Sequence, residues 1–138
     1  MITQDRKKST RQTIAEIREF LGDRLSTSMA VREQHGKDQT WAAGAPPDAV
    51  AFVEDTVEVQ RIVTICSKHP TPISAYGTGT SLEGHITAPF GGITIDTSKM
   101  NRILAVNAAD LDARVEAGVT RKALNVHLRD QGLFFPID

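Results

Sequence analysis

The sequence predicts an α+β fold, a two-layer arrangement in which helices pack on a sheet of short strands. Three observations predict it: an amphipathic helix near the start, a β-α-β pattern over residues 49–76, and further strand-like segments after residue 92. A chain of 138 residues suits a single domain that buries about two thirds of its unfolded surface. No internal repeat or low-complexity tract divides it.

Residues 1–45 are predicted to be a helical arm followed by a loop. Apolar residues recur there at spacings of three and four, which gives a helix one apolar stripe: Ile14, Ile17, Leu21 and Leu25. Thr10 or Thr13 is the predicted N-cap. Residues 26–47 show no sustained period and are predicted to form a loop, with Trp41 as its one large apolar side chain. Residues 46–138 form the second predicted unit.

The β-α-β pattern begins with a short apolar strand over residues 49–53. Asp55 and Glu58 then have the spacing of a capping box, which opens a helix. Four residues are predicted to share the apolar face of that helix: Val59, Ile62, Val63 and Cys66. Because a crossover helix joins the two strands, residues 73–76 are expected to run parallel to the first strand.

The second half alternates between short strands and turns. Period-two patterns predict strands at residues 93–96, 103–106 and 113–116. Thr120 is a predicted N-cap for a helix over residues 121–130, and Gly132 is placed to end it. His127 is expected on the buried face of this helix.

Composition excludes several classes of function. Sixteen basic and seventeen acidic residues nearly cancel, so no overall field attracts nucleic acid, and the aromatic residues are too scattered for base stacking. The apolar runs are too short to span a membrane. A single cysteine, Cys66, excludes an internal disulfide and gives no metal-ligand cluster. The polar start leads into no signal core, so the sequence predicts a cytoplasmic protein, with peripheral attachment to a membrane left open.

The most informative segment is PISAYGTGTSLEGH, residues 72–85. A short strand ends there in a loop of glycines and hydroxyl side chains. Glycine can adopt positive φ and lets the backbone approach a ligand, and successive N–H groups in such a turn can bind an anion. The segment therefore predicts a pyrophosphate cradle, and the alternative is an ordinary mobile surface turn.

Two common nucleotide motifs do not fit this loop. The dinucleotide fingerprint needs a third glycine where this chain has Leu82, and it should open a helix, which Pro89 and the glycine pair at 91–92 prevent. A P-loop would need Lys and Ser or Thr where His85 and Ile86 stand.

Four segments of the chain, taken in their order and spacing, resemble a known family. They are PPDAVAFVEDTVEVQRIV (46–63), AYGTGTSLEGH (75–85), GGITIDTSKMNRIL (91–104) and VEAGVTRKALNVHLRDQGLFFPID (115–138). They resemble the PCMH-type FAD-binding domain of the vanillyl-alcohol oxidase superfamily, most of all the branch of D-lactate dehydrogenase (cytochrome) and the glycolate oxidase flavin subunit. The likeness covers about three quarters of the chain. It implies that the chain is the N-terminal part of such a domain.

The resemblance implies a set of FAD-binding residues: Tyr76, Gly77, Thr78, Gly79, Thr80, Ser81, Leu82, Gly84, His85 and Asp138. In the family pattern residues 77–81 wrap the pyrophosphate mainly with backbone N–H groups, and Asp138 would begin a second flavin loop. His85 is expected to border the site without a covalent link, because members that attach FAD through histidine carry it directly after the first glycine pair.

The implied reaction is oxidation of a D-2-hydroxy acid, D-lactate to pyruvate above all, with electrons passed from FAD to a cytochrome or quinone. Catalytic and metal residues are expected beyond residue 138, so none is assigned here. A glycolate, D-2-hydroxyglutarate or ether-lipid synthase relative stays open, as does a nucleotide-binding or interaction module without redox activity. Alone, the chain is expected to be inactive and flavin-free and to self-associate.

Overall fold

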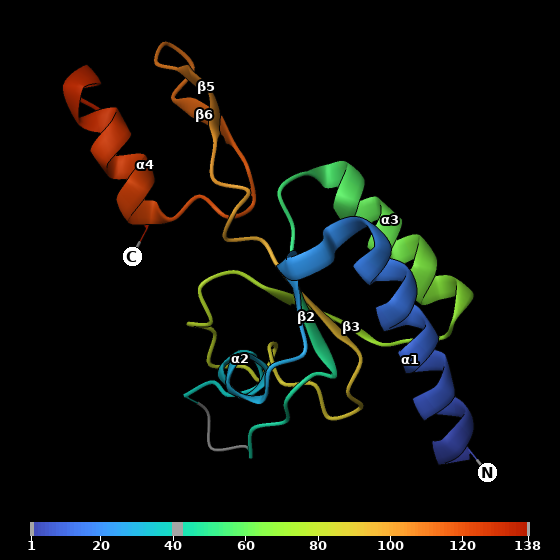
Figure 1. Cartoon of the computed structure of the whole chain (residues 1–138). Coiled ribbons are helices and arrows are strands. Elements are labelled where there is room, and N and C mark those ends of the chain that lie inside the picture. Colours follow the sequence, from blue (N-terminus) through green and yellow to red (C-terminus); the bar gives the residue numbers. More distant parts are fainter. Residues whose placement is uncertain (1, 40–42, 138) are drawn as a thin grey trace.

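The computed structural model describes residues 2–39 and 43–137 as a mixed α/β structure, which confirms the predicted fold class (Figure 1). Trp41 lies outside the described residues. The elements in chain order are α1 (Ile2–Leu21), η1 (Gly22–Arg24), β1 (Leu25–Ser26), α2 (Met29–His35), β2 (Ala49–Phe52), α3 (Thr56–Lys68), β3 (Ile73–Tyr76), β4 (Ile93–Asp96), β5 (Ile103–Asn107), β6 (Asp112–Val115), α4 (Arg121–Leu128) and η2 (Arg129–Gln131).

The main sheet has four strands in the order β1-β2-β4-β3. β2 and β3 are both parallel to β4, which lies between them, so the prediction that residues 73–76 run parallel to the first strand of the β-α-β unit is confirmed. β1 pairs antiparallel with β2 and joins the N-terminal segment to this sheet. The division of the chain at residue 45 stays a prediction.

Helices lie on both faces of the main sheet. α1 and α3 run side by side, and their side chains form one core with the β2 and β4 side chains that point the same way (Figure 1). The innermost members of this core have no exposed surface: Ile17, Ala49, Ala51 and Ile62. Alternate residues of a strand point to opposite faces, so Phe52 faces α2, where it contacts His35.

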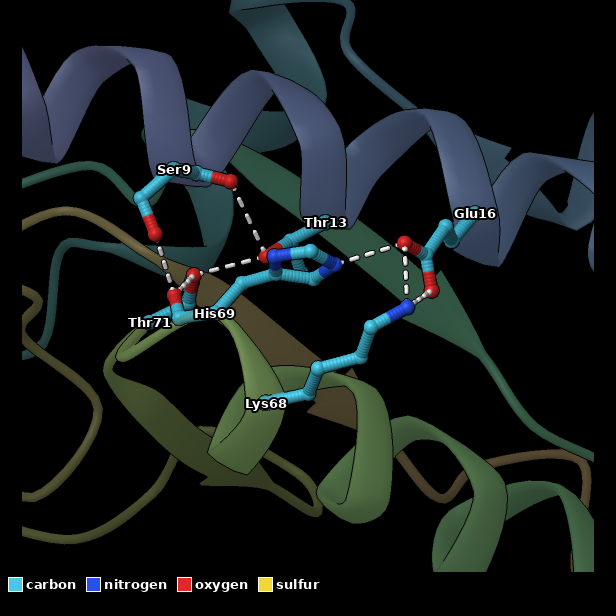
Figure 2. Close-up of polar contacts among 6 residues, drawn as sticks. All are labelled: Ser9, Thr13, Glu16, Lys68, His69 and Thr71. Atoms are coloured by element: carbon cyan, nitrogen blue, oxygen red, sulfur yellow. Dashed lines mark hydrogen bonds and ion pairs between the residues drawn. The ribbon is translucent and has the colours of Figure 1, made fainter.

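Polar side chains join the middle of α1 to the end of α3 and the residues just after it (Figure 2). The buried hydroxyls of Thr13 and Thr71 lie 2.7 Å apart, and Ser9 donates to the carbonyl of His69. One turn further along α1, Glu16 Oε1 lies 2.6 Å from His69 Nε2 and 3.0 Å from Lys68 Nζ. These contacts fix the angle at which the two helices meet.

The N-terminal segment differs from its prediction in three respects. Thr10 and Thr13 do not cap α1. They lie inside it, and their hydroxyls donate to carbonyls four residues earlier, a local bond that a mid-helix threonine makes readily. Leu25 is buried in β1 instead of extending the helix. The stretch predicted as a loop contains the last residue of β1 and the whole of α2.

The later caps were predicted correctly. Asp55 accepts from the Glu58 N–H at 2.8 Å, although Glu58 reaches back to the N–H of Glu54 rather than of Asp55. Thr120 accepts from the Ala123 N–H, and Gly132 ends the following turn at φ +69°.

Two predicted buried faces were partly wrong. On α3 the buried residues are Ile62, Ile65 and Cys66, whereas Val63 is 45 % exposed. On α4 only Leu124 and Leu128 are buried, and His127 lies at the surface.

Candidate functional site

The glycine loop begins at the carboxyl end of β3, on the edge of the sheet where β2 and β4 also end. Phe52, Asp96 and Tyr76 are register partners across these three strands. Ligands of open α/β sheets bind at this edge, beyond the carboxyl ends of parallel strands. The glycine loop therefore lies at the edge of the sheet where a ligand is expected to bind.

No helix follows the loop within residues 77–92, as the sequence analysis expected. The chain makes turns at 85–86 and 89–90 and then enters β4 through Gly92. Gly92 has φ +93°, and a Cβ there would lie 2.2 Å from the carbonyl oxygen of Pro72. This position admits only glycine, and it closes the loop against the start of β3.

The backbone N–H groups of the loop are available to a ligand. Within the part of the chain that the structure describes, none of the N–H groups from Gly77 to Leu82 donates a hydrogen bond. Six successive free donors match the acceptor-rich oxygens of a phosphate group. Gly77 leaves open space on the side where a Cβ would stand.

Gly79 brings the loop back over the ring of Tyr76. Its φ is +70°, and a Cβ there would lie 2.5 Å from the Tyr76 hydroxyl oxygen. A side chain at this position would meet both backbone strain and a steric clash. Burial, followed by the negative charge of Asp96, raises the pKa of the Tyr76 phenol, so this ring is a neutral floor for the loop.

The other predicted site residues fall into two hydrogen-bonded pairs and two separate positions. The hydroxyls of Thr78 and Thr80 lie 3.1 Å apart, and Ser81 Oγ lies 2.6 Å from His85 Nδ1. Leu82 is exposed, and Gly84 has φ +75° and receives the Thr87 hydroxyl bond at its carbonyl. Asp138 lies outside the described residues.

Sequence reasoning missed two residues beneath the loop. His35 and Asp96 are both buried, 61 positions apart, with Nε2 2.8 Å from Oδ2. His35 had no assigned role, and Asp96 was only the end of a predicted strand. The one feature of the sequence that could have indicated this pair is Asp96 itself, a carboxylate at the end of an apolar strand, just before the polar turn at 97–99.

A second concave surface lies between the β5–β6 hairpin and α4. It encloses about 720 Å³ and is mostly apolar, with Leu111, Leu124, Leu128, Phe134 and Phe135 among its lining residues. Asn125 holds the last residues against α4, because its side-chain amide donates to and accepts from the Phe135 backbone.

Two other classes of site are absent from the described residues. They contain no group of three or more His, Cys, Asp or Glu side chains that could hold a metal ion. None of their helices is long and apolar enough to cross a membrane.

Comparison with known proteins identifies the family of the chain. The model of a family described as "FAD binding domain" matches residues 47–138, more than half of the chain. The chain belongs to this family. The free N–H groups of the loop agree with a ligand that carries a pyrophosphate.

The relatives of this FAD-binding domain are flavin-linked oxidoreductases. A probable mitochondrial D-lactate dehydrogenase of Danio rerio is 42 % identical over 92 % of this chain and 26 % of its own length. Glycolate oxidase subunit GlcD of Bacillus subtilis is 34 % identical over all of this chain and 28 % of its own length. D-2-hydroxyglutarate dehydrogenases also match, at about 31 % identity.

The fold agrees with this grouping. The structure of p-cresol methylhydroxylase with substrate bound superposes with a TM-score of 0.80 at 25 % identity, over 91 % of this chain and 25 % of that one. The predicted superfamily and FAD as cofactor are thereby confirmed. The chain spans about a quarter of the length of the relatives that it matches.

Proposed function

We propose that this chain supplies the FAD-pyrophosphate site of an oxidoreductase that oxidises a D-2-hydroxy acid, with D-lactate to pyruvate as its reaction. One observation carries the proposal: six free N–H groups follow one another on a loop held over Tyr76, in a chain of the FAD-binding domain family. The ten residues named from the family pattern, Asp138 included, are the proposed cofactor contacts.

The roles of the loop residues follow from their positions. The N–H groups of residues 77–81 donate to the phosphate oxygens, and the hydroxyls of Thr78, Thr80 and Ser81 add donors at the same edge. Gly79 keeps the backbone close to the ligand. His85 borders the site non-covalently, oriented by its bond to Ser81. When bound, FAD accepts the electron pair that leaves the substrate carbon as hydride.

A titration followed by NMR tests the loop without requiring tight binding. Adding FAD to the 15N-labelled chain should shift the amide signals of residues 77–82 more than those of α1. Gly79→Val should abolish these shifts, because a Cβ collides with Tyr76. Gly22→Val is the matched control: it has φ +55° with nothing near its Cβ, and it lies in η1. Undiminished loop shifts in Gly79→Val would place the pyrophosphate elsewhere.

The substrate assignment follows the D. rerio relative and needs the complete enzyme. We expect a protein that carries this chain at the length of its relatives to reduce an artificial dye with D-lactate and not with L-lactate. The electrons would then pass to a cytochrome or quinone. Equal rates with both enantiomers, or activity only with glycolate or D-2-hydroxyglutarate, would contradict this assignment.

By itself the chain should hold FAD weakly. Ligand affinity depends on enclosing most of the ligand surface, and Gly77 and the groove beside α4 are open to solvent. We expect a colourless, inactive preparation that self-associates through exposed apolar side chains such as Leu111 and Phe134. A yellow monomer with stoichiometric flavin in size-exclusion chromatography would contradict this expectation.

We also propose a cellular compartment for the protein. The sequence predicts a cytoplasmic protein, whereas the D. rerio relative is named as mitochondrial. Fractionation of the source cells, with immunodetection of the chain, would decide between them.

A further inference from the structure

A cluster of aromatic and polar side chains lies directly beneath the glycine loop. His35, the last residue of α2, is 4 % exposed, and its ring lies between two strand ends. Its centroid lies 5.6 Å from that of the Phe52 ring, nearly perpendicular to it, and 4.2 Å from that of the Tyr76 ring, tilted by 42°. Asp96, between these two strands in the sheet, is equally buried.

The hydrogen bonds fix the orientation of the His35 ring from both sides. Nδ1 lies 2.8 Å from the carbonyl oxygen of Val31, which can only accept, so Nδ1 donates. Nε2 lies 2.8 Å from Asp96 Oδ2, while Asp96 Oδ1 accepts the Ser98 N–H at 2.7 Å. Both ring nitrogens are therefore held by oxygen atoms, Nδ1 by the backbone of Val31 and Nε2 by the side chain of Asp96.

A continuous series of side-chain contacts connects the His35–Asp96 pair to the glycine loop. Asp96 and Val31 hold the His35 ring, the ring backs Tyr76, and the Tyr76 hydroxyl lies where a Gly79 Cβ would be. The Tyr76 carbonyl accepts from the N–H of Thr97, next to Asp96. Each member of the series limits the movement of the next.

We propose that His35 is a positioning residue that, with Asp96, fixes the Tyr76 ring and through it the shape of the 77–82 loop. The inference deepens the proposed function, because it names what holds the FAD loop ready before the ligand arrives. His35 and Asp96 lie under the ring and act through Tyr76 rather than on FAD.

The chemistry of the pair supports a positioning role over a purely stabilising one. A buried hydrogen-bonded polar pair contributes little net stability compared with apolar side chains of the same volume, because both groups lose their hydrogen bonds to water. Its hydrogen bonds are directional, so it holds a ring in one orientation, which apolar packing does less strictly. A loop whose six N–H groups bond to nothing else within the described residues needs such a support.

The test uses His35→Gln in the 138-residue chain. The Gln amide can still donate to Asp96, so no buried carboxylate is left alone, but the ring behind Tyr76 is gone. We expect the 15N order parameters of residues 77–81 to fall from about 0.85 to below about 0.6. If only about a tenth of the molecules then hold the competent loop, the apparent Kd for FAD rises about tenfold.

Thr13→Val is the matched control. It removes the buried hydroxyl contact between α1 and Thr71, which precedes β3, and should destabilise the same sheet without touching the Tyr76 ring. At equal thermal stability it should leave the loop order parameters unchanged. The proposal is overturned if folded His35→Gln keeps a rigid loop, or if Thr13→Val loosens the loop equally.

The single tyrosine gives a second, spectroscopic readout. Asp96→Asn keeps an acceptor for Ser98 but removes the charge, so the ultraviolet titration of Tyr76 should move toward the ordinary phenol pKa. An unmoved titration would show that Asp96 does not act on the Tyr76 ring and would overturn its part in the proposal. These two readouts need no ligand. Loop amides that ignore FAD in the wild-type chain would instead count against the proposed function alone.

Discussion

The chain has two regions that are built differently. The sheet region comprises α1, α2, α3 and strands β1 to β4, and the hairpin region comprises β5, β6 and α4. Among the described residues, every buried apolar side chain except Leu124 and Leu128 belongs to the sheet region or its connections. In Figure 1 the hairpin and α4 extend away from the main sheet.

The difference explains where a binding site can be preformed. The glycine loop begins at the edge of a packed core where three parallel strands end together, so its first residues are anchored by that core. The hairpin region instead exposes a groove with large apolar side chains, Phe134 at 73 % and Leu111 at 79 %. The loop is thus joined to packed structure, while the hairpin region exposes apolar surface of its own.

The largest expected effect tests the core itself. Ile62→Ala should lower the free energy of unfolding by about 2–5 kcal/mol, because it leaves a cavity among fully buried side chains. Leu128→Ala, a matched aliphatic truncation in α4, should change the main urea transition much less. Circular dichroism in urea measures both, and equal losses would show that the two regions unfold as one unit.

A glycine at the junction gives the next effect. The Gly118 N–H donates to the Met100 carbonyl, and a Cβ at Gly118 would lie 1.9 Å from the Thr97 carbonyl oxygen. Gly118→Ala should therefore cost about 1–3 kcal/mol through forced backbone shifts. Gly77→Ala, which meets nothing within 4 Å, is the control and should be close to neutral in stability. A neutral Gly118→Ala would mean that the hairpin joins the sheet loosely.

Local signals made one part of the fold predictable. The capping residues Asp55 and Thr120, the left-handed Gly132 and the strand–helix–strand order around α3 depend on neighbours in sequence, and each was predicted. The absence of a helix after the glycine loop followed from Pro89 for the same reason.

Long-range pairing made the rest unpredictable. β4 enters between β2 and β3 although it follows both in sequence, and only its buried contacts select that place. α2 has seven residues and no apolar stripe, so its helix depends on packing against β2. For the site, the glycine loop was readable from composition, whereas the His35–Asp96 pair exists only after the strands align.

A smaller effect compares the two helix caps. Thr120→Ala removes the acceptor of the Ala123 N–H and should cost α4 about 1 kcal/mol. Asp55→Ala should cost α3 a similar amount. Because α4 has few tertiary contacts, its loss should appear as faster amide exchange confined to residues 121–128. The Asp55 change should lower the whole thermal transition, and global destabilisation by Thr120→Ala would contradict the separation of the regions.

The smallest expected effect is a dependence on pH at the α1–α3 contact. The bond to His69, with Lys68 second, lowers the pKa of the Glu16 carboxyl below its ordinary value (Figure 2). A lowered folded-state pKa contributes stability that is complete above the unfolded value of about 4.3 and is lost as pH falls through the folded value. Glu16→Gln should therefore melt slightly below wild type above about pH 5, and the two melting curves should converge under more acidic conditions. Glu19→Gln, also on α1 and without a recorded partner among the described residues, should show no such convergence. A difference between Glu16→Gln and wild type that grew on acidification would reverse the sign and refute the contact as a carboxylate bond.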